Sequence, residues 1–148
     1  MEKGPRFTYL SKANGKLGYT NEGHLIIEGE HDGFRNRVNK DTTHRRKIYL
    51  RDGMLIIEDT VTDASGDVEL FWHLSDEDID WSGDYHLTLK DSGIRIDFLC
   101  KNAFSIRKET FPRSLYYAVA TEAPMARVII PHVSGTVQFE TRIFLYLA

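Results

Sequence analysis

The chain has 148 residues, of which 41% are hydrophobic, and its formal net charge at pH 7 is -3. This length suits one domain with a single core, and the slightly acidic balance argues against a nucleic-acid binder, which usually carries a strongly basic face. The sequence has no run of about 18 apolar residues, the length that a membrane-spanning helix needs. Its single cysteine, Cys100, excludes an intramolecular disulfide.

The first third of the chain predicts short strands separated by turns. Residues 6–10 form a candidate strand, and the turn pair Asn14-Gly15 leads into a hairpin partner at residues 17–19. An apolar run then begins at residue 25 and continues to His31, where Asp32-Gly33 breaks it. A longer polar loop is expected after that break.

The clearest hairpin lies at residues 44–59, around the turn pair Asp52-Gly53. Strict alternation predicts that the strand before the turn shows two faces. One face carries His44, Arg46, Ile48 and Leu50, and the other carries Arg45, Lys47 and Tyr49.

The middle of the chain repeats this pattern. After a predicted loop at residues 64–67, the strand at 68–74 alternates so that Trp72 points to the core and His73 to the opposite face. Residues 75–83 are acidic and turn-rich, which is typical of a surface loop. A second hairpin turns at residues 91–93, with an inward set of Leu87, Leu89, Ile94, Ile96 and Phe98.

The last third predicts two more pairs of strands. Residues 104–111 and 115–121 flank a break at Pro112-Arg113-Ser114, and residues 125–131 and 137–147 flank a turn at Ser134-Gly135. No window shows helical periodicity over three turns, whereas period-2 alternation recurs about every ten residues. We therefore expect a single domain over residues 1–148 that is all-β, an antiparallel two-layer β-sandwich of roughly ten strands.

Three segments in this order resemble a known family. They are GEHDGF at residues 29–34, THRRKIYLRDGMLIIEDTV at 43–61 and VELFWHL at 68–74. Together they look like the carboxy-terminal β-domain of the heparinase II/III-like polysaccharide lyases. The resemblance implies that the chain is the C-terminal piece of a larger protein, packed on an upstream α/α-toroid domain. It also implies a periplasmic or secreted parent; the chain itself indicates no compartment.

The resemblance also implies what this piece lacks. The family's lyases remove the C5 proton of a uronic acid and eliminate the 4-linked sugar. Their catalytic residues come from the toroid and from two motifs of the β-region, His-x-His-x-Asp and Ala-His-Asn. In some members these two motifs also supply a zinc site. Neither motif occurs here. We therefore expect no catalytic residue, no metal ligand and no cofactor in this chain, while zinc stays an option for the parent.

A basic cluster is the candidate binding site, because guanidinium groups pair with the carboxylate and sulfate oxygens of acidic polysaccharide. Its members are Arg35, Arg37, His44, Arg45, Arg46 and Lys47. The alternative is a solvated strand face whose charges pair with neighbouring acids, and alternation splits the cluster between two faces. Two histidine–carboxylate pairs are also conceivable, His31 with Asp32 and His44 with Glu30.

Two functions follow from these observations. The first is a non-catalytic β-sandwich that supports an upstream lyase domain acting on acidic, uronate-containing polysaccharide by β-elimination. The second is a stand-alone module that binds an anionic glycan through the basic cluster.

Overall fold

The computed structural model describes residues 14–21, 25–34, 41–116 and 119–144, and all regular structure in these ranges is β-strand. The predicted strand at residues 6–10 lies outside the described residues. The strands are β1 (Gly15–Asn21), β2 (Leu25–His31), β3 (Thr43–Arg51), β4 (Met54–His73), β5 (Ile79–Asp80), β6 (His86–Leu89), β7 (Arg95–Cys100), β8 (Ser105–Tyr116) and β9 (Val119–Phe144).

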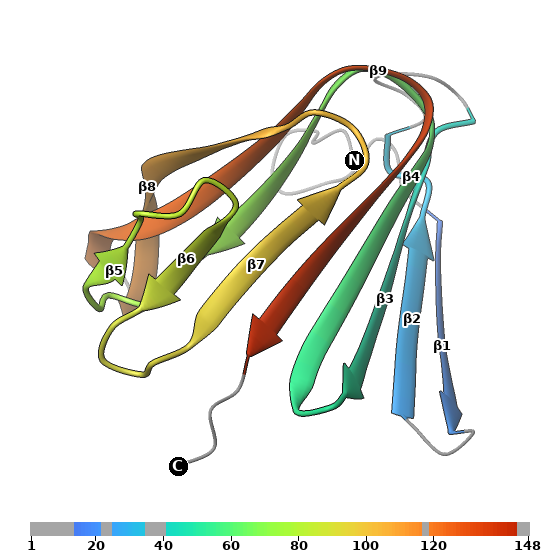
Figure 1. Ribbon diagram of the computed structural model, residues 1–148. Helices are drawn as coiled ribbons and strands as arrows, with labels where there is room; N and C mark the ends of the chain where they lie inside the picture. The colour runs from blue at the N-terminus through green and yellow to red at the C-terminus, as the bar shows by residue number, and fades with distance from the viewer. Residues whose placement is uncertain (1–13, 22–24, 35–40, 117–118, 145–148) are drawn as a thin grey trace.

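All strand pairs are antiparallel, in the order β1-β2-β3-β4-β9-β7-β6-β5, with β8 also paired to β9 (Figure 1). The predicted all-β antiparallel fold is confirmed. Both predicted hairpin turns are present. Asp52 and Gly53 adopt φ values of 51° and 75°, the left-handed pair that a two-residue turn of type I′ needs, and Leu87 pairs with Ile96 across the second turn.

Two long strands, β4 and β9, turn this one sheet into two layers. Residues 54–61 of β4 pair with residues 137–144 of β9, and residues 68–73 pair with residues 125–130. Register shifts separate the two halves, and Gly66 and Gly135 there have φ values of 104° and 95°. Such bulges bend a strand without ending it, and Figure 1 shows the pair curving over at the top.

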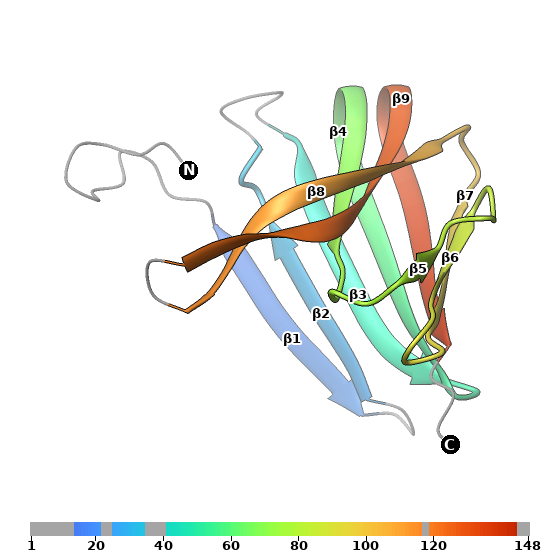
Figure 2. The same cartoon turned by 90° about the vertical axis from the view of Figure 1, so that its left-hand side faces the viewer.

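We call the sheet of β1, β2, β3, the first half of β4, the second half of β9, β7, β6 and β5 the first layer. The second layer holds the second half of β4, the first half of β9, and β8, which cross in front of the first layer in Figure 2. This arrangement is consistent with the predicted two-layer sandwich.

The core lies between the layers. The second layer contributes Leu70, Ala126, Val128 and Ile130, and the first layer contributes Leu87, Ile96, Phe98, Val137 and Phe139, all buried. Fully burying a large aliphatic or aromatic side chain stabilises the fold by roughly 1.5–3 kcal/mol, so this cluster holds the layers together. Trp72 packs against it as predicted.

Three predicted chain breaks are wrong. Residues 64–67 are part of β4, Ser134-Gly135 is part of β9, and Pro112 lies inside β8, where it is paired with Glu122. Proline lacks an N–H donor and is tolerated on edge strands, and among the described strands β8 pairs only with β9. With these fusions, the described residues hold nine strands.

Candidate functional site

The predicted basic cluster is divided by the sheet. Arg35 and Arg37 lie outside the described residues. His44 and Arg46 project from β3 toward the face that continues into the core, because Arg46 is opposite Asp59 and Asp59 opposite the core residue Phe139. Arg45 and Lys47 project from the other face. The four described members therefore do not form one patch.

On the outer face, acidic side chains neutralise the two basic residues. Arg45 Nη2 lies 2.6 Å from Glu28 Oε2, and this hydrogen bond lowers the pKa of the Glu28 carboxyl. Lys47 Nζ lies 4.0 Å from Glu58 Oε2, and the Tyr49 hydroxyl donates to Glu58 at 2.7 Å. This pairing matches the alternative of a solvated, charge-balanced face. Glycan contact by these residues stays a prediction.

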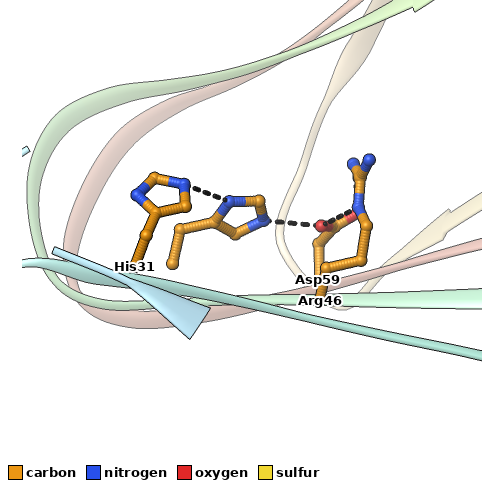
Figure 3. Close-up of polar contacts among 4 residues, drawn as sticks. His31, Arg46 and Asp59 are labelled. Carbon is orange, nitrogen blue, oxygen red and sulfur yellow. Dashed lines mark hydrogen bonds and ion pairs between the residues drawn. The ribbon is translucent and has the colours of Figure 1, made fainter. Parts of the chain in front are cut away.

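On the inner face, four side chains form one connected network, which we call the polar chain: His31, His44, Asp59 and Arg46 (Figure 3). His31 Nε2 lies 3.2 Å from His44 Nδ1, and His44 Nε2 lies 2.6 Å from Asp59 Oδ1. Arg46 donates to Asp59 twice, from Nε at 2.7 Å and from Nη2 at 3.0 Å.

Strand register brings these four residues together. His31 of β2 is directly opposite His44 of β3, and Arg46 of β3 is directly opposite Asp59 of β4. His44 and Arg46 are two residues apart, so they share a face and both reach Asp59. The site is therefore built by β2, β3 and the first half of β4, and it needs all three strands in register.

The hydrogen bonds that lead from Gly33 through the two histidines to Asp59 run in one direction, and Arg46 donates to Asp59 from the other side. The Gly33 N–H donates to His31 Nδ1 at 3.1 Å, which leaves the proton of neutral His31 on Nε2. His31 then donates to His44 Nδ1, and His44 Nε2–H donates to Asp59. Every ring nitrogen of the two histidines is thus engaged when both are neutral. An added proton would place two donors face to face, at Gly33 or between the rings.

Burial and charge tune the ends of this network. Asp59 is only 2% exposed. Burial by itself would raise the pKa of its carboxyl, but the hydrogen bonds from His44 and Arg46 outweigh that effect and hold the pKa below its ordinary value. Burial lowers the pKa of His31, and the neighbouring His44 lowers it further. The Arg46 guanidinium also lies 5.3 Å from the centre of the Trp72 ring, in cation–π range.

This geometry suits a structural role better than acid–base chemistry. A general base needs a free lone pair aimed at its substrate, and both histidines of the polar chain spend theirs on protein donors. Of the two conceivable histidine–carboxylate pairs, His44 with Glu30 is not formed, because Glu30 lies on the other face of the sheet and His44 bonds to Asp59. His31 contacts His44, and its pairing with Asp32 stays a prediction. Asp59 was missed, although its place two residues after Ile57, on the same strand face, was a usable signal.

No set of three His, Cys, Asp or Glu side chains is placed to hold a metal ion in the part of the chain that the structure describes. That part also has no helix long and apolar enough to cross a membrane.

A groove opens beside the polar chain, between the two layers. Its volume is about 440 Å³. His44, Arg46 and Asp59 line it from the first layer, and Val68 and Phe71 line it from the second. Ile130, Val137 and Phe139 of β9 also line it, so the groove runs from the polar chain into the space between the two layers.

Comparison with known proteins identifies a family. The family model described as "Heparinase II/III-like, C-terminal" matches residues 2–143. No curated protein matches.

Solved structures with the same fold include two described as heparinase III and one described as a heparan sulfate lyase. A heparinase III, the BT4657 gene product, is 20% identical with a TM-score of 0.74, covering 90% of this chain and 21% of that one. Another heparinase III is 15% identical with a TM-score of 0.73, covering 88% and 21%. The heparan sulfate lyase HepC from Pedobacter heparinus is 18% identical with a TM-score of 0.72, covering 90% and 21%. The chain thus spans about a fifth of the length of these proteins.

Proposed function

The chain belongs to the heparinase II/III-like, C-terminal family, and on that premise we propose that it is the non-catalytic β-sandwich of a larger polysaccharide lyase. In this proposal an upstream α/α-toroid domain carries the chemistry, a β-elimination on acidic, uronate-containing polysaccharide. The domain described here provides a rigid body on which the upstream part packs. Its parent is exported to the periplasm or secreted.

One observation carries the non-catalytic role: the hydrogen-bonding groups of the polar chain are occupied by one another and by the backbone of Gly33. Elimination from a uronic acid needs a base and a carboxylate-neutralising group in one preorganised pocket. Here the cation, Arg46, is held by Asp59 through two hydrogen bonds, and the histidines are tied to each other, to Gly33 and to Asp59. The groups that resemble catalytic machinery are instead cross-links between strands.

The test is a lyase assay on the parent protein and on this chain. Elimination creates an unsaturated uronate, whose conjugated double bond absorbs in the ultraviolet. We expect product from the parent with heparan sulfate or another uronate polymer, and none from this chain alone. Product from the chain alone would refute the non-catalytic role, and an inactive parent on every uronate polymer would refute the lyase assignment. Zinc in the parent is tested in the same assay by chelation.

As a second candidate function, we propose that this domain itself binds an acidic polysaccharide. The observation in favour is Arg45, whose side chain is half exposed on the outer face of β3. Binding through it should weaken as ionic strength rises, because exposed charges are screened by salt. Loss of heparin retention in an Arg45→Ala/Lys47→Ala variant, which alters the outer face and leaves the polar chain intact, would support direct contact. Absence of heparin retention at low salt would refute direct glycan binding by this domain.

A further inference from the structure

Among the residues that the structure describes, the second layer has an open edge. In the first layer, β4 lies between β9 on one side and β3 on the other. In the second layer, residues 68–73 of β4 still pair with β9, but no other described strand pairs with their opposite side. Alternate residues of this segment direct their backbone N–H and C=O groups away from β9. The edge is six residues long, keeps one register with β9 throughout, and is free of proline and glycine.

The first layer beside this edge carries an exposed apolar face. Register places Tyr19, Ile27, Ile48 and Ile57 in one row across β1, β2, β3 and β4. Exposure falls along this row from 79% at Tyr19 to 42% at Ile27 and 6% at Ile57. The row thus begins in the core and runs out to the open side of the sandwich.

Neighbouring rows extend the same face. Leu17 lies two residues from Tyr19, and Leu25 and Leu50 lie two residues from Ile27 and Ile48, so all three share the face; each is more than half exposed. Together these side chains expose an area on the order of several hundred Å². Patches of that size on a soluble protein usually mark a contact.

The opposite face of the same three strands is mainly polar, with Ile26 and Tyr49 as its partly buried apolar members. It carries Lys16 and Thr20 on β1, Glu28 on β2, and Arg45 and Lys47 on β3. This part of the sheet is therefore amphipathic, with the polar side suited to water and the apolar side suited to a cover. The second layer does not supply that cover, because it ends at the open edge of β4.

We propose that an extended segment from the upstream part of the parent protein pairs with residues 68–73 of β4 and lies over the apolar face of β1–β3. This proposal rests on the proposed function, since it assumes a longer parent. The added strand continues the second layer in the direction in which it stops, across the groove beside Arg46 and Asp59. Main-chain hydrogen bonds provide its affinity, and alternate apolar side chains pack on Tyr19, Ile27 and Leu50.

The length of the relatives supports this occupant. The structural match covers 90% of this chain but only 21% of each of the similar chains. Proteins of the same fold therefore carry a long additional chain. A strand from the same polypeptide is present at high effective concentration, and it leaves no edge open to pairing with other molecules.

Hydrogen exchange on the parent and on this chain tests the pairing. In the isolated chain, the amides of residues 68–73 that point away from β9 should exchange rapidly. In the parent these amides should exchange at least about tenfold more slowly, because they are then hydrogen-bonded. Equal, rapid exchange of these amides in the parent would overturn the proposal.

A matched pair of variants tests the face. Tyr19→Asp and Thr20→Asp alter adjacent residues of β1 that are both exposed and lie on opposite faces. In the parent, Tyr19→Asp should lower Tm by at least about 3 °C and Thr20→Asp should not, whereas in the isolated chain the two variants should behave alike. Equal shifts in the parent would overturn the proposal.

Two further outcomes separate this proposal from its premise. If the isolated chain forms a dimer whose β4 edge is as protected as in the parent, a second copy is the occupant and the proposal is wrong. If the native protein is no larger than this chain, the proposed function fails, and the proposal fails with it. A large parent with an exposed face refutes this proposal alone.

Discussion

Replacing Asp59 with asparagine should destabilise the domain strongly. Asp59→Asn keeps the shape of the side chain but removes its charge and puts an N–H₂ group where only acceptors fit. His44 Nε2 and two Arg46 nitrogens all donate to the carboxylate, at 2.6, 2.7 and 3.0 Å, so the amide of Asn must face at least one of these donors. Asp59 is 2% exposed, and water cannot repair that conflict.

The expected loss is about 2–3 kcal/mol. Removing one partner of a fully buried ion pair costs about 3–5 kcal/mol, but the Arg46 side chain is 40% exposed and keeps part of its hydration, which reduces the cost. For a chain of this length, that loss corresponds to a decrease in Tm of roughly 5–10 °C. Urea unfolding at pH 7 measures it directly, provided that the m-value does not change.

Glu58→Gln is the matched control, because Glu58 precedes Asp59 on the same strand and lies on the opposite, solvated face. Its carboxylate is partly exposed, with Lys47 at 4.0 Å, so its loss should cost below about 1 kcal/mol. Equal losses in the two variants would refute the reasoning. The difference between wild type and Asp59→Asn should also shrink as pH falls below about 3.9, because the lowered pKa of Asp59 makes its contribution present above that pH and lost in acid.

Three further predictions concern pH and backbone geometry. The lowered pKa of His31 means that the unfolded chain takes up this proton first, so stability should be full above about pH 6.5 and fall below it; His31→Gln should flatten that fall in urea midpoints between about pH 5 and 7. Burial and the hydrogen bond to Glu58 raise the pKa of Tyr49 to about 12. The stability that Tyr49 contributes is therefore present below about pH 10 and lost as the pH approaches 12. In an absorbance titration, Tyr49→Phe should remove the tyrosinate step at the highest pH. Gly135→Ala should cost about 1 kcal/mol or more, because φ there is 95°, whereas Gly18→Ala, with open space around it and no positive φ, should be neutral or slightly stabilising in urea unfolding.

Local signals in the sequence predicted the hairpins well. Asp52-Gly53 turns β3 into β4 because both residues adopt positive φ, and alternation placed Trp72 against the core. Such features depend on residues that are adjacent in the chain. Period-2 alternation and turn pairs were therefore sufficient to predict these hairpins.

The bends of β4 and β9 were predicted as loops, because a glycine in a bulge and a glycine in a turn look alike in sequence. Gly66 and Gly135 supply the positive φ of a bend, but whether the chain reverses there depends on pairing between strands about 70 residues apart. Local residues do not encode that pairing. The contacts of the polar chain could not be predicted for the same reason: alternation places Asp59 on the same strand face as Ile57, but Asp59 meets His44 and Arg46 only after β3 and β4 are in register.

The size of the native protein tests the central claim most directly. An antibody raised against the purified domain should detect, in extracts of the source cells, a band several times larger than the 17.1 kDa of this chain. Such a band would show that the domain is one part of a longer polypeptide, as its family membership and its open sheet edge lead us to expect. A band at 17.1 kDa would contradict the account and leave a free-standing, glycan-binding module as the function to test.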